Sequence, residues 1–134
     1  MNFKNIFTWV LRILAAVILL QTLYFKFTAA PESVLIFSKL GIEPWGRIGT
    51  GCVELVTGIL LLINRTVLIG AIMGIGVMLG AIASHLLVLG ISSAGDGGQL
   101  FLYANIVLVS CCWITWVNRS QGISMIKKIF PGRK

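Results

Sequence analysis

Charged residues are scarce in this chain. Only four acidic and eleven basic side chains occur among its 134 residues, whereas 57% of the residues are hydrophobic. A soluble globule needs a more polar surface than this, and the mean hydropathy of +0.98 is typical of a membrane protein. A helix that crosses the hydrocarbon core needs about 20 apolar residues, so the chain has room for four spans. The composition therefore predicts an all-α protein, a four-helix transmembrane bundle.

Motifs for metals and thiol chemistry are also missing. The three cysteines are Cys52 and the neighbours Cys111 and Cys112, without CxxC or CxxCH spacing, and His85 is the single histidine. Neighbouring residues on a helix point about 100° apart, so we interpret the vicinal cysteines as small apolar residues and not as a redox pair. The sequence predicts no metal and no covalent cofactor, and gives no support to zinc, haem c or a thioredoxin-type centre.

The net charge of +7 does not predict binding to nucleic acid. The basic residues lie at span ends and in the C-terminal tail, without the interleaved aromatic residues of a nucleic-acid-binding surface. The positive-inside rule explains their positions more simply. Membrane lipid is therefore the first partner that we expect.

Four apolar segments are predicted to span the membrane within a domain of residues 1–118. A cleaved signal peptide is the alternative for the first segment, but its apolar run exceeds the usual length of about 7–15 residues. Arg12, near the start of that segment, is expected to extend its side chain to the interface. The predicted spans are approximately residues 6–26, 48–63, 67–91 and 99–117.

Glycines are frequent in the third segment. Gly70, Gly74, Gly76 and Gly80 form two small-xxx-small pairs. Such glycines let helix backbones approach closely in lipid. We therefore expect all four to be packing residues.

The long loop and the tail have their own patterns. Pro31, Glu32 in the first turn and Gly41 after the end predict a short amphipathic helix in the first outer loop, on the membrane surface or covering the bundle. Residues 119–134 mix five basic residues with apolar ones, which predicts a basic amphipathic cytoplasmic tail resting on an anionic leaflet.

Four spans place both termini on one side of the membrane. Lys4, Arg65 and the basic tail fall on that side, so both termini are predicted to be cytoplasmic in a bacterial plasma (inner) membrane. The long loop and the glycine-rich loop of residues 92–98 then face outward.

One carboxylate, Glu54, interrupts an apolar segment. A charge at membrane depth costs at least about 2.5–3.5 kcal/mol on insertion scales, so it should face the bundle interior and have a partner. We expect Glu54 to pair with Lys26, Arg47 or His85, with Tyr103 or Gln99 completing the hydrogen bonds. The alternative is a purely structural tie that sets the helix register. The predicted topology gathers the candidate ligand-binding residues in the outer half of the bundle: Gln21, Lys26, Arg47, Glu54, His85, Gln99 and Tyr103.

A series of short motifs resembles the DoxX family over roughly residues 8–117. The resemblance implies a small four-helix membrane protein, in a family tied by name and by some members to thiosulfate:quinone oxidoreductases and membrane redox complexes. It also implies that Lys26, Glu54 and His85 match the family's recurring polar positions, while no cysteine motif here corresponds to a thiol redox centre. The motifs are TLYFKF, PESVLIFSKLGIEPWGRIGTG, CVEL, SHL and GDGGQLFLYA.

These observations leave three functional hypotheses. The first is a redox-associated accessory subunit, with a polar pocket that binds a quinone or a small polar ligand and with a membrane or redox protein partner that supplies electrons. The second is a non-enzymatic scaffold or assembly factor for a larger complex. The third, a small permease, is disfavoured because polar residues do not continue through the inner half.

Overall fold

The computed structural model describes residues 2–132, and within that range it contains helices and connecting loops but no strand. Four of the helical stretches are long and apolar enough to cross a membrane. The predicted all-α, four-helix transmembrane bundle is confirmed. The elements are α1 (Phe3–Phe27), α2 (Pro31–Lys39), α3 (Trp45–Leu62), α4 (Val67–Ser84), the π-helical η1 (His85–Leu89), α5 (Gln99–Val117) and α6 (Arg119–Ile129).

The helix bounds differ from the predicted spans mainly at two places. The first span begins at Phe3 and not near residue 6, and α3 begins at Trp45 and not near residue 48. The predicted third span changes helix type, because α4 is α-helical to Ser84 and continues as a π-helix to Leu89. The π-helix is a rare form, and here it makes the last turn of the span, which His85 opens.

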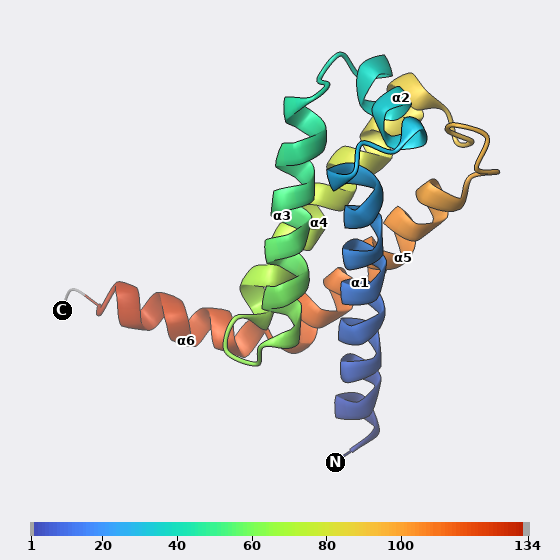
Figure 1. Cartoon of the computed structure of the whole chain (residues 1–134). Coiled ribbons are helices and arrows are strands. Elements are labelled where there is room, and N and C mark those ends of the chain that lie inside the picture. Colours follow the sequence, from blue (N-terminus) through green and yellow to red (C-terminus); the bar gives the residue numbers. More distant parts are fainter. Residues whose placement is uncertain (1, 133–134) are drawn as a thin grey trace.

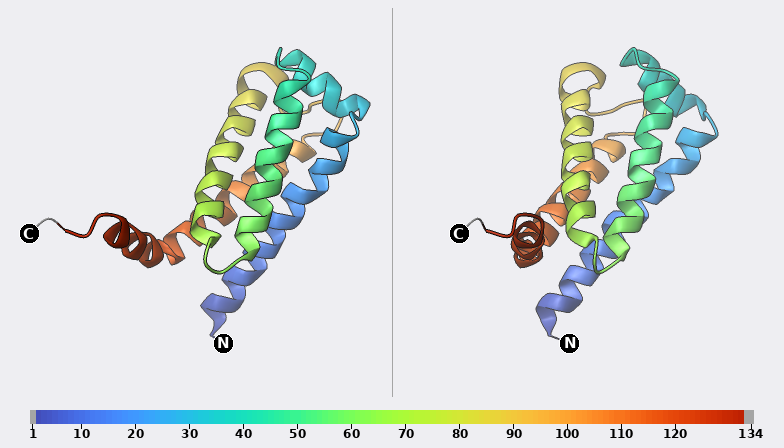
Figure 2. Two further views of the ribbon diagram at one scale, coloured as in Figure 1. Left: turned by 60° about the vertical axis from the view of Figure 1, so that its left-hand side comes forward. Right: turned by 90° about the vertical axis from the view of Figure 1, so that its left-hand side faces the viewer.

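The bundle consists of two closely packed helix pairs, α1 with α3 and α4 with α5. The short helix α2 lies at one end of the bundle, and the N-terminus and α6 lie at the other (Figure 1). We call these the α2 end and the α6 end. The helix α5 runs obliquely away from α1 toward the α2 end (Figure 1), whereas α3 and α4 run side by side from the turn that joins them (Figure 2).

Small residues bring the helices together toward the α6 end. A Cβ on Gly70 would lie 2.9 Å from the backbone nitrogen of Leu61, and one on Gly74 would lie 2.6 Å from Sγ of Cys111. These two glycines are packing residues, as predicted. The prediction was wrong for Gly76 and Gly80, where an added Cβ would meet nothing within 4 Å.

Arg12 is buried, so the expectation that it extends to the interface was wrong. Its Nε donates to the carbonyl oxygen of Leu61 at 2.7 Å, and its Nη1 donates to Oδ1 of Asn64 at 2.9 Å. The guanidinium also lies over the ring of Trp9, 3.8 Å from its centroid. Arg12 therefore satisfies a carbonyl at the C-terminal end of α3, where the helix dipole favours a cation.

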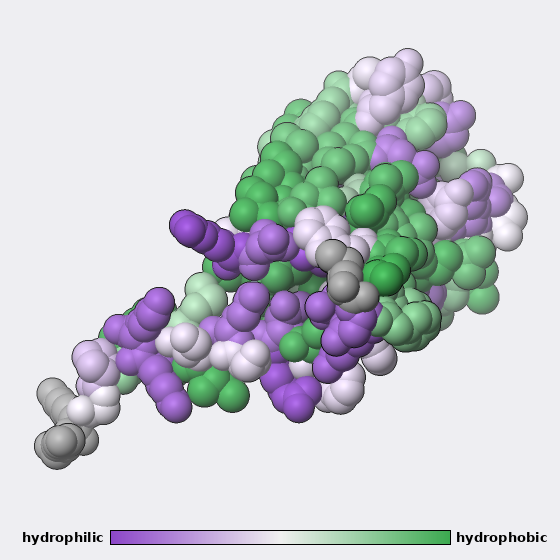
Figure 3. Space-filling model, turned by 90° about the horizontal axis from the view of Figure 1, so that it is seen from below, coloured by the Kyte–Doolittle hydropathy of each residue, from purple (hydrophilic) through white to green (hydrophobic). Residues whose placement is uncertain are grey.

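The predicted tail forms α6, which has no buried residue and projects sideways from the bundle (Figure 1). Seen from below, hydrophilic residues gather along α6 and across the α6 end, whereas the bundle around them is mostly hydrophobic (Figure 3). The tail's last two basic residues, Arg133 and Lys134, lie outside the described residues. The large apolar residues of α6 and its end are exposed: Ile123, Ile126, Ile129 and Phe130.

Candidate functional site

A cavity of about 930 Å³ lies in the α2 half of the bundle and is lined from both helix pairs, α2, η1 and the loop at residues 92–98. Its volume is in the range of small-molecule sites, and most of its lining is apolar. A minority of the lining side chains is polar: Gln21, Thr22, Lys26, Glu32, Ser33, Thr50, Glu54, Ser84, His85, Asp96, Gln99 and Tyr103.

Glu54 faces this cavity and is paired with Lys26, one of the three partners that were predicted. Lys26 Nζ donates to Oε2 of Glu54, and the side chains are only 13% and 8% exposed. The hydroxyl of Thr22 donates to the same oxygen at 3.0 Å. Thr22 was missed, although its place four residues before Lys26 puts both on one face of α1.

The second carboxylate oxygen of Glu54 is free within the described part of the chain. Both hydrogen bonds reach Oε2, and none from residues 2–132 reaches Oε1. Glu54 is 6% exposed as a residue, but Oε1 is not among the fully enclosed side-chain atoms that lack a partner, so it borders the cavity. Oε1 is therefore an acceptor available to water or to a ligand.

Arg47 takes a different position from the one that was predicted. Its Nε donates to both oxygens of Glu43, at 2.8 and 3.0 Å, and its Nη1 donates to the backbone oxygen of Lys26. It is absent from the cavity lining. Arg47 holds the start of α3 against the end of α1, so it positions Lys26 and does not itself pair with Glu54.

His85 opens the π-helical segment and is 5% exposed. Its Nδ1 lies 2.9 Å from the carbonyl oxygen of Gly90, and the N–H of Gly90 donates to the His85 carbonyl at 2.7 Å. Because a carbonyl oxygen only accepts, this contact assigns the proton to Nδ1. Nε2 is then an acceptor, and no other described residue hydrogen-bonds to it.

Gln99 and Tyr103 line the cavity but bond to each other. Gln99 Nε2 donates to the Tyr103 hydroxyl oxygen at 2.7 Å. The expected hydrogen bond from either residue to Glu54 is not present among the described contacts. Gln21 lines the cavity as an exposed side chain.

Asp96 is a further residue of the cavity lining that was not predicted. Its carboxylate accepts from the backbone N–H groups of Leu100, Gly98 and Ser93 at 3.0, 2.8 and 3.0 Å. Burial alone would raise the pKa of this carboxyl, but the three backbone donors outweigh burial and hold the pKa below its ordinary value. An Asp just before a predicted helix is a capping signal that could have identified it.

A model of the DoxX-like family matches residues 10–115. The chain belongs to the DoxX-like family. The matched range covers most of the bundle and every polar residue of the cavity. Comparison with curated proteins and with solved structures gives no match. Family membership and the four candidate spans establish a multi-pass membrane protein.

The chemistry of the DoxX-like cavity is that of a hydrogen-bonding site with an apolar surround. Lys26 and the Tyr103 hydroxyl are donors, while Glu54 Oε1 and His85 Nε2 are acceptors without a partner among residues 2–132. Across residues 2–132, no group of three His, Cys, Asp or Glu side chains is placed to hold a metal ion.

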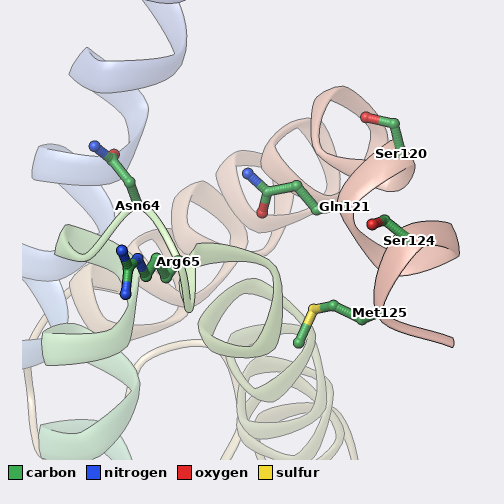
Figure 4. A pocket seen from close by; sticks show the side chains of 6 residues that line it. All are labelled: Asn64, Arg65, Ser120, Gln121, Ser124 and Met125. Atoms are coloured by element: carbon green, nitrogen blue, oxygen red, sulfur yellow. The ribbon is translucent and has the colours of Figure 1, made fainter. Parts of the chain in front are cut away.

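A second hollow of about 540 Å³ lies at the α6 end of this DoxX-like protein. Asn64 and Arg65 come from the turn between α3 and α4, and the other lining residues come from α6 on the opposite side (Figure 4). None of the predicted site residues lines it. The candidate site is therefore the cavity at the α2 end.

Proposed function

We propose that this DoxX-like protein is a redox-associated accessory subunit whose cavity binds a quinone headgroup or a small polar ligand. One observation carries the proposal. Glu54 Oε1 and His85 Nε2 are polar atoms of buried residues without a protein partner among the described residues, and both residues line one large, mostly apolar cavity. A ligand with hydrogen-bonding groups would satisfy both atoms.

The residues fit the chemistry of a quinone, which would supply paired electron and proton transfer when bound. Lys26 and the Tyr103 hydroxyl are donors that suit a carbonyl oxygen. Glu54 and His85 are groups that can carry a proton to or from a ligand oxygen. In this proposal, the electrons come from a membrane or redox protein partner.

The proposal includes a location. We place the chain in the bacterial plasma (inner) membrane with both termini in the cytoplasm, because the positive-inside rule favours that orientation. The cavity then opens in the outer half of the bilayer.

The test is native mass spectrometry of the gently extracted protein, with organic extraction to identify bound small molecules. Wild type is compared with Glu54→Gln and with Cys52→Ser, a substitution at an exposed residue of the same helix outside the cavity lining. We expect one small molecule per chain in wild type and Cys52→Ser, and its loss from a folded Glu54→Gln protein. If none of the three proteins carries a small molecule, the proposed binding site is contradicted. If all three carry the same amount, Glu54 is a structural tie and not a ligand-binding residue.

A non-enzymatic scaffold or assembly factor is the second candidate. The exposed apolar residues of α6, together with its projection from the bundle, favour docking to a larger complex (Figure 1). Deletion from Ser120 onward would then remove a co-purifying protein partner and leave any small-molecule occupancy unchanged. Retention of the partner by the shortened protein would contradict the scaffold proposal.

A further inference from the structure

The cavity reaches the surface of the bundle between α3 and α4. Trp45 and Val53 of α3 line the cavity and are nevertheless 69% and 40% exposed. Residues that border both the cavity and the surface mark its rim. Gly49 of α3 and Gly76 and Gly80 of α4 also line the cavity and are exposed. We call this gap, rimmed by these five residues, the α3–α4 opening.

The three glycines keep the α3–α4 opening clear. A Cβ added at Gly49, Gly76 or Gly80 would meet nothing within 4 Å. On the same helix α4, by contrast, Gly70 and Gly74 are pressed against neighbours at 2.9 and 2.6 Å. The two helices therefore touch near their connecting turn and leave bare backbone beside the cavity.

The α3–α4 opening lies at membrane depth. Gly80 and Gly76 precede His85 by five and nine residues, which places them about 7 and 13 Å along the helix from it, toward the membrane centre. Trp45, the first residue of α3, lies where aromatic residues commonly mark the membrane–water interface. A molecule that passes Gly76 and Gly80 therefore comes from the hydrocarbon phase and not from water.

Elsewhere, the exposed residues of the cavity lining carry full side chains and are not glycines. They are Gln21 and Phe25 of α1, Glu32 of α2 and Gln99 of α5. The cavity is also larger and more apolar than a small polar ligand requires. Its lining suits a ligand with one polar end and one hydrocarbon end.

We propose, building on the function proposed above, that the α3–α4 opening is a lateral portal for an amphiphile dissolved in the membrane. Its polar headgroup reaches Glu54 and His85, and its hydrocarbon tail lies across Gly49, Gly76 and Gly80 and continues into the bilayer. This selects a tailed, lipid-soluble ligand over a small water-soluble one.

Two probes that share one headgroup test the portal: dimethoxy-methyl-benzoquinone without a tail, and the same quinone with a decyl tail. Binding is measured on purified protein in nanodiscs for wild type, Gly80→Leu, Gly49→Leu and Glu54→Gln. Ala83→Leu is the matched control, because Ala83 is an exposed residue of α4 outside the cavity lining. Thermal unfolding verifies that each variant is folded.

We expect the Gly80→Leu and Gly49→Leu proteins to lose affinity for the tailed quinone by about tenfold or more, the loss expected when a few methylene groups are displaced. Their affinity for the tailless quinone, and both affinities of Ala83→Leu, should stay within about twofold of wild type. Glu54→Gln should lose both probes.

Unchanged binding of the tailed quinone in both glycine variants would overturn the portal while leaving the headgroup site intact. Failure of both probes to bind wild type would remove the quinone proposal, and the portal with it.

Discussion

At the scale of single residues, burial of the ion pair between Lys26 and Glu54 carries a desolvation cost. Both charges are taken out of water, and their attraction offsets that cost only while both partners are present. Removing one partner of a buried pair typically destabilises a protein by about 3–5 kcal/mol, because the other charge is left uncompensated.

We therefore predict that Lys26→Met is less stable than the double variant Lys26→Met/Glu54→Gln. The single substitution strands a carboxylate in an apolar cavity, whereas the double substitution leaves a neutral amide. Thermal unfolding in detergent measures the order. Glu54→Gln alone is measured as well. If the loss of stability in the double variant equals the sum of the losses in Lys26→Met and Glu54→Gln, the two residues are not coupled.

Asp96 is expected to make the stability of the protein depend on pH. Its carboxylate accepts three backbone N–H bonds at the start of α5, and its pKa is held below the ordinary value of about 3.9. Because the folded-state pKa is the lower one, the stabilisation is present above the unfolded pKa and is lost as pH falls through the folded pKa. Asp96→Ala should cost about 1 kcal/mol at neutral pH, as for a lost cap, and this difference should vanish in strong acid.

Ser92→Ala is the control for that titration. The Ser92 hydroxyl accepts from the N–H of Gly97 at 3.2 Å in the same loop, but it carries no charge in the accessible pH range. The cost of Ser92→Ala should not depend on pH. A pH-independent cost for Asp96→Ala as well would show that its charge does not matter.

At the scale of elements, α4 uses its glycines for two purposes. Gly70 and Gly74 allow close packing, and Gly76 and Gly80 leave space beside the cavity. The small-xxx-small pattern contains all four and does not distinguish them. Which flank of the helix meets a neighbour depends on the tertiary arrangement, so this difference could not be predicted from the sequence.

We predict that Gly74→Ala is destabilising and Gly76→Ala is not. The new methyl group at position 74 would meet Sγ of Cys111 at 2.6 Å, whereas at position 76 it would enter open space and replace a residue of poor helix propensity. Adding Cys111→Ala to Gly74→Ala removes the clashing sulfur and should restore part of the loss. Thermal unfolding is measured for wild type, Gly74→Ala, Gly76→Ala and the double variant Gly74→Ala/Cys111→Ala. Equal stability of Gly74→Ala and Gly76→Ala would contradict the packing difference.

At the scale of the whole molecule, the number of spans and the buried carboxylate could be predicted from the sequence. Runs of apolar residues define membrane helices, and a carboxylate within such a run needs a partner. The choice of Lys26 over Arg47 could not be predicted, because both have long side chains near the same end of the bundle and differ in the direction in which those side chains point. The burial of Arg12 could not be predicted either, because its partners are the backbone carbonyl of Leu61, which bears no signature in the sequence, and Asn64, 52 residues away.

The placement of basic residues leads to a prediction for the molecule as a whole. Lys4, Arg65 and the tail are at the α6 end, while the basic residues near the α2 end include Lys26 and Arg47, which are engaged in ion pairs. The positive-inside rule counts Lys and Arg in short loops, so the α6 end should remain in the cytoplasm.

A green fluorescent protein fused to the C-terminus should therefore fluoresce, and alkaline phosphatase fused after Gly97 should be active. The reverse pattern would place the cavity in the cytoplasmic half of the bilayer and exclude an outer-leaflet route for the ligand. As a control on the fusions, alkaline phosphatase placed after Arg65, in the turn between α3 and α4, should be inactive.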